Sequence, residues 1–130
     1  MWSHLSDANL HFANLQGTNL KGVNLNWGDL READLREADL RKADLNWAML
    51  NNADLRGANL GDAFLQYTDL RGVNLREANL GAADLYRVEF SRANLEGARL
   101  GEAILKFALM REAIICNTEM HDGQLTMRDC

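Results

Sequence analysis

The 130-residue sequence has no proline, and aromatic residues make up only 7% of it. Ordinary globular cores are built around large aromatic side chains, so a core of that kind is not expected here. The sequence also lacks an apolar run of about 18 residues, the length that indicates a membrane-spanning helix. Its first ten residues have neither the basic start nor the apolar stretch of a signal peptide. We therefore expect a cytoplasmic protein without a membrane segment.

Cysteine and basic residues are also scarce. The two cysteines, Cys116 and Cys130, are too few for a disulfide framework, and we expect free thiols. Acidic side chains outnumber basic ones by 19 to 14, which gives a net charge of −5 and argues against unassisted nucleic-acid binding. The chain is nevertheless 47% apolar, too much for a disordered segment, and its length fits one domain.

An apolar residue occurs at every fifth position from Leu5 to Leu125. Of these 25 positions, 21 are leucine and none is polar. Alanine fills 16 of the 24 positions that lie two residues before a member of this series, from Ala8 to Gly123. Asp or Asn fills 15 of the 19 positions between the two, from Asn9 to Arg99. The repeat unit is therefore Ala-(Asp/Asn)-Leu followed by two mostly polar residues.

A period of five fits neither a helix nor a flat strand. Five helical residues rotate the chain by 500°, so the leucines would scatter over all faces. In a strand they would alternate between the two faces, because five is odd. A short extended triplet followed by a corner satisfies the pattern, since its first and third side chains both point inward.

A second period, of 20 residues, gives the number of sides. Trp27, Trp47 and Tyr67 recur at this spacing, and Arg87 and Phe107 continue the same column. Four units per 20 residues predict a four-sided coil of about six turns, roughly 29 Å long at the spacing of paired strands.

Tandem copies such as Ala33-Asp34-Leu35 and Ala93-Asn94-Leu95 resemble the pentapeptide-repeat family over nearly the whole chain. The resemblance implies an all-β fold, a right-handed quadrilateral parallel β-helix (a solenoid), often with a cap at one end. The leucine-centred repeats look most like those of cyanobacterial members. We expect an N-terminal cap over residues 1–5, the β-helix over 6–125 and a C-terminal tail over 126–130.

The two polar residues of each unit form the corners. A type II turn needs a positive φ at its second central residue, which favours Gly or Asn. Most units place other residues there, such as Glu32, Glu37 and Lys42. We therefore expect type I-like turns at many corners.

Residues 101–116 allow two interpretations. The five-residue register continues through them, yet the middle residues of the units become apolar at Ile104, Leu109 and Ile114. Either the coil continues with an apolar outer surface, which the register favours, or this segment forms a capping helix. Because open strand edges invite pairing, the apolar end predicts a homodimer through the C-terminal end.

No residues converge as catalysis requires, so we expect no enzyme, no cofactor and no metal site. His4, His11 and His121 lie near the two ends of the coil and are expected to be surface residues. The stacked Asp and Asn residues could suggest calcium, but hydrogen bonding to neighbouring backbone is the better interpretation. Arginines at the corners after Asp34 and Asp39 indicate a solvated face with weak ion pairs.

The column of Trp27, Trp47, Tyr67, Arg87 and Phe107 is a candidate interaction stripe. Stacking that stiffens the rod is one interpretation, and a protein-binding stripe is the other, since Trp, Tyr and Arg are common in interface hot spots. The sequence thus predicts a non-enzymatic scaffold or protein-interaction module with an unidentified protein partner. The resemblance implies an alternative, a DNA-mimicking modulator of type II topoisomerase (gyrase).

Overall fold

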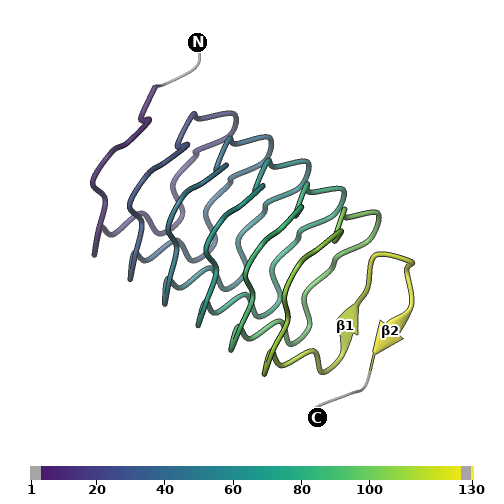
Figure 1. Ribbon diagram of the computed structural model, residues 1–130. Helices are drawn as coiled ribbons and strands as arrows, with labels where there is room; N and C mark the ends of the chain where they lie inside the picture. Colours follow the sequence, from purple (N-terminus) through teal and green to yellow (C-terminus); the bar gives the residue numbers. More distant parts are fainter. Residues whose placement is uncertain (1–3, 127–129) are drawn as a thin grey trace.

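The computed structural model describes residues 4–126 and residue 130. The chain winds into a coil whose successive turns lie side by side (Figure 1). Parallel bridges join the middle residue of each triplet to the residue 20 positions later, as between Asp34 and Asp54 and between Asn74 and Asn94. The period of 20 residues per turn is therefore confirmed, and each turn contains four triplets.

Each side of the coil is so short that pairing between turns takes the form of single bridges instead of long strands. Within the described residues, the only strands are β1 (Thr118–Glu119) and β2 (Leu125–Thr126). Backbone hydrogen bonds still tie each inner turn to both neighbours. The N–H of Leu35 donates to the Asp54 carbonyl at 2.8 Å, and the N–H of Asp54 donates back to Ala33 at 3.0 Å. Proline, which has no N–H, is excluded from such positions.

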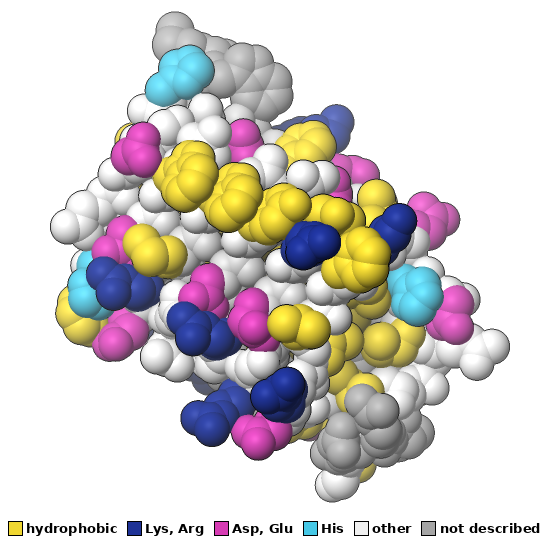
Figure 2. Space-filling view, viewed as in Figure 1, with side chains coloured by type: hydrophobic (Ala, Val, Ile, Leu, Met, Phe, Trp, Pro, Cys, Tyr) yellow, Lys and Arg dark blue, Asp and Glu magenta, His cyan; other side chains and the backbone are white. Residues whose placement is uncertain are grey.

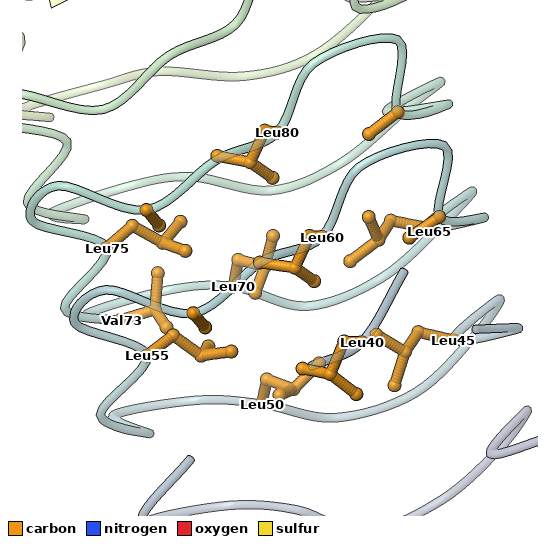
Figure 3. Packing of buried hydrophobic residues seen from close by; sticks show 14 of the residues in the cluster. Leu40, Leu45, Leu50, Leu55, Leu60, Leu65, Leu70, Val73, Leu75 and Leu80 are labelled. Atoms are coloured by element: carbon orange, nitrogen blue, oxygen red, sulfur yellow. The ribbon is translucent and has the colours of Figure 1, made fainter. Parts of the chain in front are cut away.

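Leucine and alanine fill the interior, and from Leu25 to Leu100 the leucine side chains are essentially inaccessible to solvent. Figure 3 shows the leucines of successive turns stacked above one another. Phe90 takes the place of a leucine and is also fully buried. Two of the threonines in the alanine column, Thr68 and Thr118, are buried, and their hydroxyls donate to the carbonyls of Leu45 and Leu95. Both buried hydroxyls are therefore hydrogen-bonded.

The prediction of type I-like corners is wrong. Glu32, Glu37 and Lys42 have φ of 58°, 58° and 59°, and the residue before each is absent from the set with positive φ. The first and fourth residues of each of these three corners are hydrogen-bonded, as from the Ala33 N–H to the Leu30 carbonyl at 3.1 Å. A positive φ at the second central residue only is the signature of a type II turn.

At the N-terminal end, His4 pairs with Asn24, so residues 4 and 5 belong to the first turn of the coil and form no separate cap. The rest of the expected cap, residues 1–3, lies outside the described residues. Leu5 is exposed and Leu10 and Leu15 are partly buried, because no earlier turn covers them in the described part of the chain.

At the C-terminal end, the coil continues through residues 101–116, where Ile104, Leu109 and Ile114 all pair with the preceding turn. A capping helix is therefore not what the structure shows. The coil does not extend to Leu125 as expected, because the chain reverses after Met120. Strand β2 then pairs antiparallel with β1, and Leu125 is exposed.

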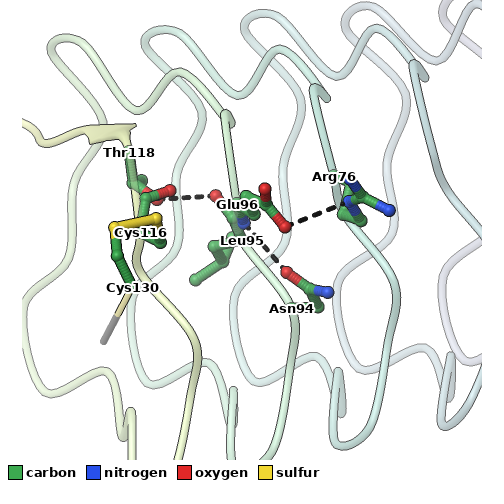
Figure 4. Close-up of a disulfide and its surroundings, with 7 residues drawn as sticks. All are labelled: Arg76, Asn94, Leu95, Glu96, Cys116, Thr118 and Cys130. Carbon is green, nitrogen blue, oxygen red and sulfur yellow. Dashed lines mark hydrogen bonds and ion pairs between the residues drawn. A yellow bond between two sulfur atoms is a disulfide. The ribbon is translucent and has the colours of Figure 1, made fainter. Parts of the chain in front are cut away.

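The two cysteines are joined, which corrects the expectation of free thiols. Cys116 lies at the corner before β1, and the Cys116–Cys130 disulfide has a Cα–Cα distance of 4.8 Å (Figure 4). The reversal after Met120 brings the chain end back toward Cys116. Residues 127–129 of the expected tail lie outside the described residues. In the described part of the chain we find no helix with the length and hydropathy needed to cross a membrane.

A candidate interaction surface

Five aromatic rings from successive turns form a continuous row on one corner of the coil, which we call the aromatic ladder: Trp27, Trp47, Tyr67, Tyr86 and Phe107. The first three stack face to face. The centroids of Trp27 and Trp47 lie 4.9 Å apart, and those of Trp47 and Tyr67 lie 4.3 Å apart, with interplanar angles of 4° and 3°. Tyr86 then makes edge contacts with both Tyr67 and Phe107, at 5.7 and 5.8 Å.

The structure thus brings together the five residues of the predicted stripe but adds Tyr86. Arg87 occupies the expected position in the column, yet its guanidinium lies over the neighbouring rings, with Cζ 5.6 Å from the centroid of Tyr86 and 5.1 Å from that of Phe107. Its Nε also donates to the Tyr86 hydroxyl at 3.3 Å, and this hydrogen bond lowers the pKa of Tyr86. Lys106 places Nζ 5.4 Å from the Phe107 centroid.

The corner conformation aligns the ladder. Trp27, Trp47, Tyr67 and Phe107 all have φ between 61° and 64°, so their side chains leave the backbone in the same direction on successive turns. Sequence reasoning missed Tyr86 because it precedes the column by one residue. The sequence did contain a signal for Tyr86, because the aromatic column is interrupted by the non-aromatic Arg87 and Tyr86 stands directly before it.

Exposed apolar residues lie on both sides of the ladder. Phe64 and Ile104 are outward-facing residues of the side that precedes this corner, and Met49 and Leu109 are on the side that follows it. Ile104, Phe107 and Leu109 are about half exposed and lie within six residues of chain. Ile104 and Leu109, two of the three apolar residues predicted at the C-terminal end, therefore flank the predicted stripe. Ile114 lies on the next side of the coil.

We call the ladder together with Met49, Phe64, Ile104 and Leu109 the ladder surface. Figure 2 shows its rings as a row of hydrophobic side chains that runs along the coil, with Lys and Arg side chains beside its C-terminal part. Exposed apolar side chains in a contiguous group, bordered by polar ones, mark interaction sites more often than scattered ones do.

The Asp and Asn columns bond to backbone, as predicted. The Oδ1 of residue i accepts the N–H of residue i+2 at many corners, for example from Arg36 to Asp34 at 3.2 Å and from Gly81 to Asn79 at 2.9 Å. This is an Asx-type turn, which holds the corner in place. No group of three or more His, Cys, Asp or Glu residues in the described range is arranged to hold a metal ion.

Where arginine follows two residues after aspartate, its side chain returns to the same carboxylate. Arg36 donates from Nε and Nη2 to the two oxygens of Asp34 at 2.8 and 2.7 Å. The same pairing occurs in Asp29–Arg31, Asp39–Arg41, Asp54–Arg56 and Asp69–Arg71. The hydrogen bonds from arginine lower the pKa of Asp29, Asp34 and Asp39 to about 2.

Two shallow hollows lie on the outer surface of the described part of the chain. One, of about 530 Å³, is lined by Asn51, Ser91 and three arginines, Arg71, Arg92 and Arg111. Arg71 pairs with Asp69 and Arg92 pairs with Glu112, so acidic partners offset most of this charge. The other, of about 500 Å³, contains His121 but neither His4 nor His11. The three histidines do not meet in either hollow.

The sequence matches the description "Pentapeptide repeats" in eight copies, over residues 3–26, 18–57, 53–92 and 89–126. No match was found among curated proteins. Among solved structures, the pentapeptide repeat protein Rfr23 from the cyanobacterium Cyanothece is 34% identical, with a TM-score of 0.56. That alignment covers 78% of this chain and 63% of Rfr23, so the chain spans less than two thirds of that relative.

Two other solved structures are more distant. HetL from the cyanobacterium Nostoc, involved in heterocyst differentiation regulation, is 29% identical with a TM-score of 0.45, covering 95% of this chain and 79% of HetL. QnrB1, a plasmid-mediated fluoroquinolone resistance protein, is 18% identical with a TM-score of 0.39, covering 99% and 78%. The eight matched copies extend over almost the whole sequence, and the chain therefore belongs to the pentapeptide repeat family.

Proposed function

We propose that the chain is a non-enzymatic protein-interaction module and that the ladder surface is its binding site. The observation that supports this most strongly is the continuity of the aromatic ladder. Its five rings adjoin one another from turn to turn, and four exposed apolar side chains lie on the two sides of the coil that flank it. Rings fixed by stacking lose little conformational entropy on binding, and Trp, Tyr and Arg are enriched in binding hot spots.

The test is a variant in which Trp27, Trp47 and Tyr67 are replaced by serine. A native partner is first identified by affinity purification with the wild-type chain from the source organism, and binding of that partner is then measured for the variant. We expect binding to be lost while the coil still unfolds cooperatively. Phe12→Ser is the matched control, because Phe12 is an exposed aromatic residue at another corner of the coil. Unchanged binding by the serine variant would contradict the proposal.

Modulation of gyrase by DNA mimicry is the second candidate. QnrB1 resembles this chain too remotely to support it. The mixed charge of the corners, where Asp29, Asp34 and Asp39 are neutralised by their arginines, also differs from the uniform negative surface of a DNA mimic. A supercoiling assay with purified gyrase tests it, and we expect no effect.

The proposal also includes a right-handed coil and a homodimer through the C-terminal end. The β1–β2 hairpin continues the backbone pairing beyond the last turn of the coil only on the side that contains β1. The N–H groups of Leu105 and Met110 have no backbone acceptor in the described residues. Open edges of this kind pair readily with another chain. Analytical ultracentrifugation is expected to show a dimer that Leu109→Lys dissociates, and a monomer at high concentration would contradict it.

We further propose a cytoplasmic location. Reducing systems keep most cytoplasmic thiols reduced, so in this location the Cys116–Cys130 disulfide is expected to be open in the cell and both cysteines to react with a thiol reagent added at lysis. A fully protected pair would instead indicate an oxidising compartment.

A further inference from the structure

We infer that the ladder surface binds an acidic peptide segment in which carboxylates alternate with apolar side chains. This inference rests on the proposed function and names the chemistry of the partner. It follows from which parts of the rings are exposed, which donors lack partners and where the uncompensated cations lie.

In the middle of the ladder, Trp47 presents its edge to the partner, because stacking covers both of its faces. Trp47 has Trp27 on one face and Tyr67 on the other, at interplanar angles of 4° and 3°. A nucleic-acid base or a sugar binds aromatic residues through their faces, so Trp47 does not suit either. Ring edges carry partial positive charge and attract oxygen acceptors.

Two polar groups of the ladder are donors without acceptors, whereas the Tyr86 hydroxyl already accepts from Arg87. The indole N–H groups of Trp27 and Trp47 make no hydrogen bond to any described residue. Both side chains are exposed, so these donors are accessible to a partner. Arg87 and Lys106 contact rings and form no ion pair with a described carboxylate. By contrast, Arg71 on the neighbouring side of the coil pairs with Asp69 at 2.6 Å.

The carboxylates beside the ladder accept hydrogen bonds from neutral groups and keep their negative charge. The oxygens of Asp84 accept from the Gln66 amide at 2.6 Å and from the Tyr86 N–H at 3.2 Å. Glu89 accepts the hydroxyl of Ser91. None of these carboxylates is paired with Arg87 or Lys106. The surface therefore combines the cations Arg87 and Lys106, N–H donors and ring edges at the ladder with flanking sides on which apolar and acidic residues alternate, as Asp84 does between Phe64 and Ile104.

A partner that matches this surface supplies carboxylate or carbonyl oxygens to Arg87, Lys106 and the indoles, and apolar side chains to Phe64 and Ile104. An extended segment that alternates Asp or Glu with Leu, Ile or Val has this composition. A basic segment would place its charge against Arg87 and Lys106, and a neutral one would leave both cations without an acceptor on binding.

The test follows the indole N–H signals of Trp27 and Trp47 by NMR while the intact protein is titrated with three synthetic peptides. One alternates Glu with Leu, the second Ser with Leu and the third Lys with Leu. We expect the Glu peptide to shift both indole signals and to bind about tenfold more tightly than the Ser peptide, with an affinity that falls as salt is added. The Lys peptide is expected not to bind.

The variant R87Q/K106Q should weaken binding of the Glu peptide about tenfold, because a charge-assisted hydrogen bond is lost at each site. The control K21Q/K42Q removes two lysines that also lack ion pairs with described residues but lie at another corner, and should bind as the wild type does.

Equal binding of the Glu and Ser peptides, or no effect of R87Q/K106Q, would overturn the inference. If both peptides nevertheless shift the indole signals, the ladder remains a docking site and the proposed function survives. Binding of the Glu peptide without any shift of either indole signal would contradict both, since it would place the peptide elsewhere on the protein. Absence of binding by all three peptides overturns the inference, and the native partner then tests the proposed function separately.

Discussion

The indole ring of Trp47 lies parallel to that of Trp27, with an interplanar angle of 4° and 4.9 Å between centroids. Trp47 also stacks on Tyr67, so it makes two ring contacts where Trp27 makes one. An aromatic pair contributes about 0.5–1.5 kcal/mol. Trp47→Ser should therefore lower the free energy of unfolding by roughly twice as much as Trp27→Ser. Urea unfolding measures both. Equal losses would show that the stacking contributes little, because both residues have nearly the same φ.

The Asp–Arg pairs predict loss of stability in acid. The pKa of Asp34 is lowered from 3.8 to about 2 in the folded state, chiefly by its hydrogen bond from Arg36. Above 3.8 the carboxylate is charged in both folded and unfolded chains, and the pair contributes fully. As the pH falls from 3.8 to about 2 the unfolded chain binds the proton first, so the free energy of unfolding decreases.

The triple variant R31Q/R36Q/R41Q should flatten this pH dependence, because the three aspartates then titrate nearer their ordinary range. Unfolding midpoints in urea, compared over that pH window, measure the effect. K42Q is the control, since Lys42 forms no ion pair with a described aspartate and does not lower the pKa of Asp29, Asp34 or Asp39, and it should keep the wild-type slope. An unchanged slope in the triple variant would mean that these pairs are too well solvated to matter.

The leucine column predicts a gradient of stability along the coil. Leu55 is completely buried between neighbouring turns, so Leu55→Ala should cost about 2–5 kcal/mol through the cavity that it leaves. Leu10 lies in the first turn and is only partly buried, so Leu10→Ala should cost clearly less. Chemical denaturation of the two variants tests the difference. Similar costs would imply that the first turn is covered in solution, for example by another chain.

The type II corners predict that one substitution is costly at the second central position of a corner and nearly neutral at the first. Lys42 has a φ of 59°, where a β-branched residue is strained, so Lys42→Val should cost about 1–3 kcal/mol. Lys21 is the first central residue of its corner and is not among those with positive φ, so Lys21→Val should be nearly neutral. Thermal unfolding of the two variants is the measurement. A neutral Lys42→Val would support type I-like corners after all.

The Cys116–Cys130 disulfide predicts sensitivity to reductant. The bond closes a loop with a sequence separation of 14 residues, and a loop of about 15 residues is expected to contribute about 3 kcal/mol. Reduction should lower the unfolding midpoint of the oxidised wild type. The double variant C116S/C130S should match the reduced protein and no longer respond to reductant. A response that persists in the variant would come from a source other than this bond.

Much of the fold could be predicted because every unit repeats the same pattern of apolar and polar residues. Leucine at every fifth position requires an inward-facing residue on every side, and the column of Trp27, Trp47 and Tyr67 reveals four sides per turn. The corners at Glu32 and Glu37 were mispredicted because turn preferences describe an isolated turn. Here the Glu37 N–H donates to the carbonyl of Arg56 on the next turn at 3.0 Å. Pairing with the neighbouring turn therefore decides the corner conformation against the local preference.

The sequence by itself determined the repeat, the leucine interior, the 20-residue period and most of the aromatic ladder, because each depends on spacing along the chain. Tertiary structure alone decided the inclusion of Tyr86, the position of Arg87 over the rings and the pairing of Cys116 with Cys130. Whether Tyr86 and Arg87 contact the neighbouring rings depends on how far their side chains extend from their own corner toward the next turn. The disulfide depends on the chain reversal after Met120, where the repeat ends and spacing no longer predicts which residues meet.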